Sequence, residues 1–416
     1  MGHVCHIMRA LGESTSSEID CAALDAFVEV FGPRLWREHL AALQRIPSAQ
    51  TRAGRALLQR HCIELTLERL RRSAPRPLNT AERCIAALAA DAVALANDLP
   101  AAARLRLCAL LRRSLDEAGT LVSVFHLLRT AALQRSRGFE VTFAALEDEA
   151  PFDLLIQRDG VEAEVACDTV SAEEGRGVHR GAWFRLVDRI DPELQTWLAA
   201  HPGRYLLKVT LPQGLKSAAS PEVQDGDALA LLHRRITGLL SQQRRADQDE
   251  AAVLRLDPLL LAAAQADELG LMPRLRREFG PEAHLCVITT GGGVFAMAAR
   301  AGRENEIAAA VRRRMATIVP ARLTGHRPGI LAMFIEDIDR DEWRGLRERL
   351  ELEGEARQFM THPEARSVVA ITCTSRLELF GLTEPDAAPG GELRFRNPAH
   401  PAAKAPALAP AVLSSM

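Results

Sequence analysis

The sequence contains little lysine, few aromatic residues and almost no net charge. Only three of its 416 residues are lysines, aromatic residues make up 4%, and the formal net charge is −2. Proteins that bind nucleic acid without sequence preference usually carry excess positive charge and aromatic side chains on which bases stack. These deficits argue against strong nonspecific binding to DNA or RNA, and they leave local patches of arginine as the route to a nucleic acid.

Long apolar runs, a secretory leader and paired cysteine motifs are also missing. No stretch approaches the roughly 18 consecutive apolar residues that a membrane-spanning helix needs. The N-terminus, MGHVCHIMRALGES, lacks the charged segment followed by an apolar one that marks a secretory signal. The eight cysteines are scattered without a CxxC pair, as is usual for reduced cysteines. We therefore predict a cytoplasmic protein with no membrane partner, whose cysteines form neither disulfides nor a zinc site.

The hydrophobic pattern predicts a helical region followed by a mixed α/β region. A chain of 416 residues exceeds what one hydrophobic core usually serves, so two domains are expected. From Glu18 to about Gly119, apolar residues recur three and four positions apart, which predicts a bundle of about five helices. We place an N-terminal all-α domain at residues 1–115 and an α/β domain at 116–383. Residues 384–416 are rich in proline and alanine, and we expect a disordered tail there.

The periodicity changes after Gly138, where a predicted helix ends. Arg158-Asp159-Gly160 is typical of a hairpin turn between two short apolar runs. Strands are predicted at residues 139–143, 152–157, 161–167, 205–211, 284–290, 329–336 and 368–374. Helices are predicted at residues 182–200, 228–245 and 304–322. Helices that alternate with strands indicate a mixed α/β layer.

Carboxylates gather on one side of the second strand of this hairpin. Alternate residues of a strand share a face, so the apolar face carries Val161, Ala163, Val165 and Cys167. The opposite face carries Glu162, Glu164, Ala166 and Asp168. Asp153 opens the preceding strand, and the hairpin brings it to the same polar face. Carboxylate oxygens in such an arrangement suit a divalent cation.

This stretch resembles the PD-(D/E)XK, or restriction-endonuclease-like, superfamily. The outline of that family is a helix, a Gly-Phe strand, an aspartate, a hairpin and a strand with Glu-x-Lys. Gly138-Phe139 and Asp153 match the outline, and Ala166-Cys167-Asp168 stands where Glu-x-Lys is expected. The resemblance covers about residues 116–211. It implies a restriction-endonuclease-like mixed β-sheet flanked by helices, here preceded by the all-α domain.

The two departures from the family motif affect the chemistry directly. Phosphodiester hydrolysis needs a metal ion held by carboxylates and positive charge where the transition state becomes negative. Asp168 replaces the lysine and inverts the sign of that charge, which is expected to remove roughly 10³ or more in rate. Ala166 removes a metal ligand as well. The motif therefore predicts a degenerate catalytic centre.

Two features keep an active enzyme open as an alternative. Glu164 lies one pleat before Ala166, so an oxygen cage for Mg²⁺ or Mn²⁺ would consist of Asp153, Glu164 and Asp168. A displaced cation would have to replace the missing lysine. The candidates are Lys208, which we take as the fourth catalytic residue, and Arg176 and His179.

These observations predict a nuclease-like pseudoenzyme that acts by binding DNA, RNA or a protein partner. The first alternative is an active, divergent Mg²⁺-dependent endonuclease or exonuclease that uses Asp153, Glu164 and Asp168. The second is a structural or assembly protein in which the α/β layer serves as an interaction scaffold.

Overall fold

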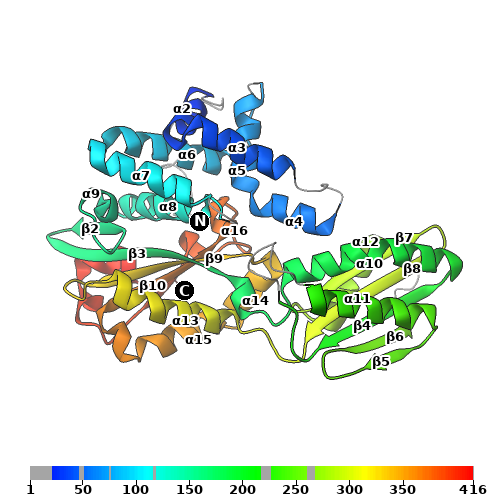
Figure 1. Cartoon of the computed structure of the whole chain (residues 1–416). Helices are drawn as coiled ribbons and strands as arrows, with labels where there is room; N and C mark the ends of the chain where they lie inside the picture. Colours follow the sequence, from blue (N-terminus) through cyan, green and yellow to red (C-terminus); the bar gives the residue numbers. More distant parts are fainter. Residues whose placement is uncertain are drawn as a thin grey trace. The chain divides into compact units, whose positions relative to one another are not determined.

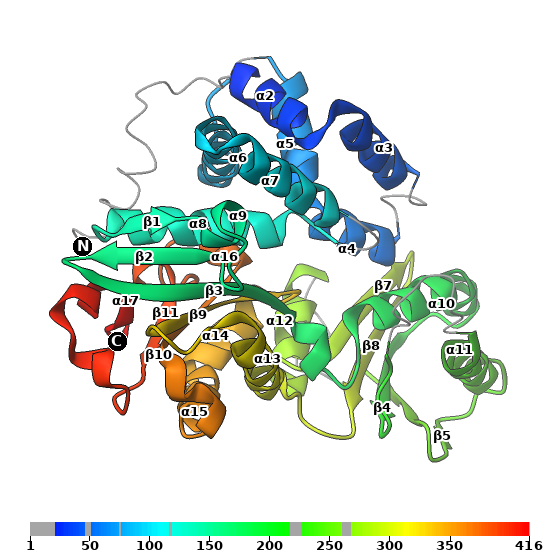
Figure 2. The ribbon, with the colours of Figure 1, turned by 60° about the vertical axis from the view of Figure 1, so that its left-hand side comes forward.

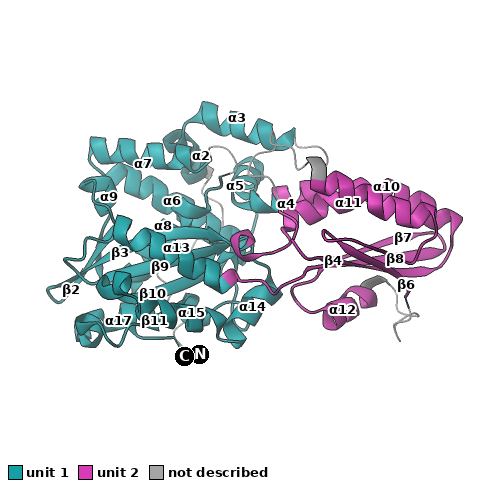
Figure 3. Ribbon diagram, turned by 60° about the horizontal axis from the view of Figure 1, so that its bottom comes forward, with its two compact units in different colours: residues 1–46, 58–172, 308–416 teal, residues 47–57, 173–307 magenta. Residues whose placement is uncertain are grey.

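The computed structural model describes residues 21–45, 51–74, 76–115, 119–216, 226–259 and 268–415. Spatial clustering separates two units, shown in Figure 3: residues 1–46, 58–172 and 308–416 form unit 1, and residues 47–57 and 173–307 form unit 2. Most of unit 2 is therefore a long insertion in the sequence of unit 1. The predicted boundaries after residues 115 and 383 follow changes in composition, whereas this division follows spatial proximity.

The N-terminal region is helical, as predicted. Its helices are α2 (Cys21–Phe31), α3 (Pro33–Gln44), α4 (Arg52–Arg60), α5 (Cys62–Arg72), α6 (Thr80–Asp98) and α7 (Ala101–Arg113), followed by α8 (Val122–Ser136). Pro33 occupies the first position of α3, where its missing N–H is tolerated. Asn79 caps α6 by accepting a hydrogen bond from the backbone of Glu82, whose side chain accepts one from the backbone of Asn79. This reciprocal pair fixes where the helix starts.

Unit 1 contains a six-stranded mixed sheet with the order β1-β2-β3-β9-β10-β11. Figure 1 labels β2, β3, β9 and β10 of this sheet. The strands are β1 (Glu140–Thr142), β2 (Leu154–Arg158), β3 (Val161–Ser171), β9 (Gly329–Glu336), β10 (Val368–Ser375) and β11 (Leu393–Arg396). Strands β1, β2 and β3 are antiparallel neighbours, and β9 runs parallel to both β3 and β10. The predicted hairpin at residues 158–160 is confirmed, with Asp159 and Gly160 in the left-handed conformation that such turns use.

The two faces of this sheet are covered by different helices. Figure 2 shows α8 along one face, and α13 (Ile307–Arg322), α14 (Arg340–Glu348) and α15 (Glu351–Met360) along the other. Ala163 and Val165 of β3 belong to the same hydrophobic core as the N-terminal helices. The predicted alternation is thereby confirmed for β3, since Glu164 on the opposite face contacts the segment that follows α13.

The C-terminal residues are packed against unit 1, and the prediction of a disordered tail is wrong for residues 384–415. Strand β11 pairs with β10, and Leu408 and Val412 are fully buried in the core that includes the N-terminal helices. The segment contains the short helix α17 (Ala409–Val412), and the short helix α16 (Arg376–Leu379) precedes it. Composition misled the prediction because proline and alanine are common in disordered segments. Here they form short helical turns whose apolar side chains pack against the core.

Replacing Leu408 by alanine tests this packing. Leu408 is 0% exposed, so we expect the free energy of unfolding to fall by about 2 kcal/mol in chemical denaturation, as for other buried leucines. Leu413 is 48% exposed and serves as the control, because Leu413→Ala should change stability little. Equal, negligible effects of the two substitutions would show that the segment does not contribute to the core.

Unit 2 is a second α/β layer with a five-stranded mixed sheet of order β5-β6-β4-β8-β7. Its strands are β4 (Arg204–Leu211), β5 (Ala246–Gln248), β6 (Val253–Pro258), β7 (His284–Thr290) and β8 (Gly293–Ala301). Its helices are α10 (Arg180–Ala200), α11 (Gly226–Ser241) and α12 (Glu268–Phe279). The predicted mixed α/β class with an N-terminal helical region is confirmed, and strands β5, β6, β8 and β11 were not predicted. Among the described residues, no helix has the length and apolar character required to span a bilayer.

Candidate functional site

Asp153 lies just before β2, at the position where the resemblance expects a metal-binding aspartate. The pairing of Leu154 with Val165 places Asp153 beside Ala166 on β3. Its Oδ2 atom accepts hydrogen bonds from the backbone N–H of Cys167 (2.7 Å) and from Nη2 of Arg322 (2.6 Å). Both contacts hold the carboxylate against β3 and the end of α13.

Asp168 lies near the C-terminal end of β3, on the same face of the strand as Glu164 and Ala166. It pairs with a second arginine of α13. Nη2 of Arg314 donates to Oδ1 of Asp168 at 3.1 Å, and Nε of Arg314 donates to Oδ2. This is the two-pronged geometry in which a guanidinium binds a carboxylate most specifically. The residue at the position where the resemblance expects a lysine therefore has a cation of its own.

Glu164 is fully buried and is satisfied by the segment between α13 and β9. Its Oε2 accepts the backbone N–H of Thr324 at 2.8 Å, and its Oε1 accepts the hydroxyl of the same residue. Nη1 of Arg327 lies 3.8 Å from Oε1 of Glu164, while Nε of Arg327 donates to Glu162 at 2.6 Å. Glu164 thus serves as an anchor for the turn that leads into β9.

Together these contacts form a ladder along β3, in which each acidic residue has its own partner. The order of pairs from the C-terminal end of β3 is Asp168 with Arg314, Asp153 with Arg322, and Glu164 with Thr324. Arg314 and Arg322 are eight residues apart on α13, which corresponds to about 12 Å along a helix. The carboxylates are therefore spread along the strand and held one by one.

Sequence reasoning found the acidic residues but missed Arg314, Arg322, Thr324 and Arg327. The available signal was the arginine-rich helix that precedes a strongly apolar strand. Because α13 leads directly into β9, which pairs with β3, arginines on the side of α13 that faces the sheet can meet the polar face of β3.

The cations proposed from the sequence belong to unit 2 and have partners there. Lys208 lies on β4, and its Nζ is 3.2 Å from Oδ2 of Asp257 on the neighbouring strand β6. Arg176 donates to Glu173, and Nδ1 of His179 lies 3.9 Å from the same carboxylate. The contacts of Lys208 thus support a role in the five-stranded sheet.

The protonation of Asp153 reflects competition between burial and its arginine. Burial raises the pKa of Asp153 above its ordinary value, and the charge of Arg322 together with the hydrogen bond from Cys167 opposes that rise. The nearby charge of Asp168 adds to the rise in the pKa of Asp153. The charge of Arg322 therefore offsets the repulsion between the carboxylates of Asp153 and Asp168.

The donor set does not fit the Mg²⁺ or Mn²⁺ ion that the resemblance implies. Mg²⁺ requires near-octahedral oxygen ligands at about 2.0–2.1 Å. Both oxygens of Asp168 and one of Asp153 are taken by guanidinium groups, and both oxygens of Glu164 by Thr324. Ala166, the remaining position, offers only a buried methyl group.

Comparison with protein-family models, curated proteins and solved structures gives no significant match. Membership of the PD-(D/E)XK superfamily therefore stays a prediction that rests on the residues of β1 to β3 and on the segment around them.

Proposed function

We propose that the protein is a non-catalytic, nuclease-like binding protein of the cytoplasm, in which arginines have replaced the metal ion of an ancestral site. The observation that carries this proposal is the pairing of Asp153 with Arg322 and of Asp168 with Arg314. The succession of α8, antiparallel β1 to β3, α13 and parallel β9 supports it, because the family outline includes a helix, a hairpin and a later helix-strand unit.

The ion pairs make hydrolysis of a phosphodiester unfavourable. A nuclease of this kind needs carboxylates that are free to bind a metal ion, and the metal in turn activates water. Here a metal ion would have to displace guanidinium groups already 2.6–3.1 Å from the carboxylate oxygens. The positive charge of Arg314 is also neutralised by Asp168 and is not directed at a reacting phosphate.

The same pairing favours a protein partner over a nucleic acid. Arg314, Arg322 and Arg327 all pair with carboxylates of β3 or of the residue before β2. A phosphate group would have to break these pairs before it gained a contact, and the chain has no overall positive charge to attract it. We therefore expect no shift of DNA or RNA in gels at low salt. A shift that disappears as salt rises would instead support nucleic acid as the partner.

A digestion assay tests the absence of catalysis. We expect plasmid DNA, linear DNA and RNA to stay intact with the purified protein in Mg²⁺ and in Mn²⁺. Asp153→Ala is the control for contaminating nucleases, because activity that survives this substitution does not come from the site. Cleavage that requires the metal and disappears in Asp153→Ala would overturn the proposal.

A second candidate function is the divergent nuclease, because two cations lie beside the acidic residues. Arg314 or Arg322 would then supply the positive charge that the missing lysine gives in the family, after rotating away from its carboxylate. This candidate predicts that Arg314→Ala loses cleavage while the protein stays folded. The non-catalytic proposal predicts no cleavage in either protein.

A further inference from the structure

Two histidines and a glutamate meet between α3 and α5, away from the acidic residues of β3. His39 lies on α3, His61 directly precedes α5, and Glu64 lies in the first turn of α5. The spacing of three residues places His61 and Glu64 on one side of α5. One nitrogen or oxygen atom of each residue lies within 4.8 Å of the other two. The two imidazole rings are 5.4 Å apart, and Nδ1 of His61 is 4.0 Å from Oε2 of Glu64.

Each of the three residues of this cluster has an unpartnered side-chain atom. Among the residues that the structure describes, Nε2 of His39, Nδ1 of His61 and Oε2 of Glu64 are buried atoms without a hydrogen-bond partner. His61 is 4% exposed and Glu64 is 0% exposed. A buried polar atom without a partner destabilises a fold, so three such residues in one cluster favour a site for a ligand.

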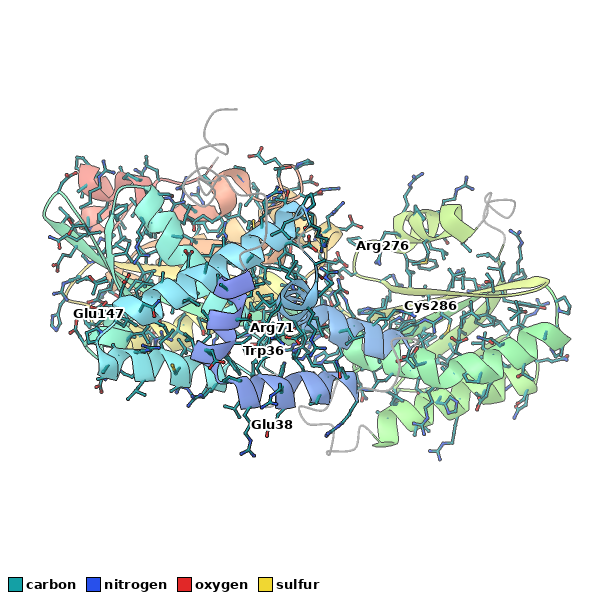
Figure 4. All side chains as sticks on the ribbon, turned by 90° about the horizontal axis from the view of Figure 1, so that it is seen from above. Trp36, Glu38, Arg71, Glu147, Arg276 and Cys286 are labelled. Carbon is teal, nitrogen blue, oxygen red and sulfur yellow. The ribbon has the colours of Figure 1, made fainter. Side chains whose placement is uncertain are left out.

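The next turn of α5 shows how a buried glutamate is normally satisfied here. Glu68 accepts hydrogen bonds from Nε1 of Trp36 and from Arg71, at 3.0 Å each. Figure 4 labels Trp36 and Arg71, which lie close together between these helices. The unpaired oxygen of Glu64 is therefore a local feature of the cluster and not a general property of the helix pair.

Burial favours the neutral form of both imidazole rings. Burial lowers the pKa of His61 to about 4, with help from the neighbouring His39, and it lowers the pKa of His39 as well. A neutral ring keeps a free electron pair, which a metal ion requires. Burial also raises the pKa of Glu64 to about 7, and a nearby divalent cation would favour its ionised form.

We propose that His39, His61 and Glu64 bind one divalent transition-metal ion of the Zn²⁺ class. Two imidazole nitrogens and one carboxylate oxygen form a ligand set that zinc accepts, with bonds of about 2.0–2.2 Å and a fourth position left for water. Imidazole disfavours Mg²⁺ and Ca²⁺ as the occupant. Small side-chain rotations are needed, because neighbouring ligands of a tetrahedral ion are about 3.4 Å apart. The ion would link α3 to α5 and satisfy all three unpartnered atoms.

Zinc titration of the chelator-treated full chain tests the proposal. We expect one equivalent of Zn²⁺ that is lost in His39→Ala and in Glu64→Gln, and a rise in melting temperature on adding Zn²⁺ that is lost in both variants. His362→Ala is the matched control, because His362 is exposed and lies beside the carboxylate of Glu364. The N-terminal His3, Cys5 and His6 are also metal-ligand types, and they lie outside the described residues. They are the same in all these proteins, so they do not account for a difference between the variants.

Co²⁺ in place of Zn²⁺ gives a readout that does not depend on the stability of a variant. The wild-type protein with one equivalent of Co²⁺ should show the intense visible absorption of a low-coordinate site, and Zn²⁺ should displace it. Absence of that absorption, or zinc binding in His39→Ala equal to that of His362→Ala, would overturn the proposal. Neither result would bear on the non-catalytic nature of the acidic residues of β3.

Discussion

Replacing Glu164 by alanine is expected to lower the free energy of unfolding by about 4 kcal/mol. Glu164 is 0% exposed, and both of its carboxylate oxygens accept hydrogen bonds from Thr324. The substitution leaves the backbone N–H of Thr324 without its partner and opens a cavity behind β3, and each effect is expected to cost about 1–3 kcal/mol. Chemical denaturation followed by circular dichroism measures the loss.

Glu162→Ala is the matched control for this prediction. Glu162 lies on the same face of β3 two residues earlier and pairs with Arg327, but its side chain is 35% exposed. Exposed ion pairs contribute little, so this variant should lose less than about 1 kcal/mol. If Glu164 instead belonged to an empty metal cage, Glu164→Ala would be as stable as wild type or more stable, because removing one of several clustered carboxylates relieves their repulsion. A Glu164→Ala protein as stable as wild type would therefore contradict the ladder of pairs.

Replacing Arg322 by alanine should lower the free energy of unfolding by about 3 kcal/mol at neutral pH. The substitution leaves Asp153 as a mostly buried carboxylate without its cation, a change that costs about 3–5 kcal/mol when the pair is fully buried. We take the lower end because the side chain of Arg322 is 30% exposed and water screens the pair. The double variant Asp153→Asn with Arg322→Ala should recover part of the loss, since no unpaired charge remains.

The loss in Arg322→Ala should shrink as the pH falls. Burial already raises the pKa of Asp153 in the folded protein, and removal of the arginine raises it further. Between the unfolded and the folded pKa, the folded state binds more protons than the unfolded state, so lowering the pH through this range stabilises the variant relative to wild type. The difference in unfolding free energy between wild type and variant should be smaller at pH 4 than at pH 8. A difference that does not change with pH would show that Asp153 is not the group left unpaired.

The helical region and the β2–β3 hairpin of unit 1 could be predicted from local patterns, but the partners of its acidic residues could not. Alternating residues and a clear Asp-Gly turn define the β2–β3 hairpin, and these signals are local. Asp168 and Arg314 are 146 residues apart, and Asp153 and Arg322 are 169 residues apart, with most of unit 2 between them. Nothing in the sequence near an arginine shows which distant carboxylate it meets.

Two other features were missed for different reasons. Strand β8 begins at Gly293, directly after the two-residue turn that joins it to β7, and its run of alanines lacks the β-branched residues that mark strands. In the helical region, His61 and Glu64 have a spacing that places them together, but His39 comes from another helix. The cluster of His39, His61 and Glu64 forms only in the folded chain, where α3 meets α5.

A calorimetric titration of Mn²⁺ into the wild-type protein and into Asp153→Ala tests the central claim most directly. The claim is that Arg322 and Arg314 hold Asp153 and Asp168, and Thr324 holds Glu164, in place of a metal ion. It predicts that the two proteins give the same isotherm, because Oδ2 of Asp153 already accepts hydrogen bonds from Arg322 and Cys167. A saturable binding step that is present in wild type and lost in both Asp153→Ala and Glu164→Gln would contradict it.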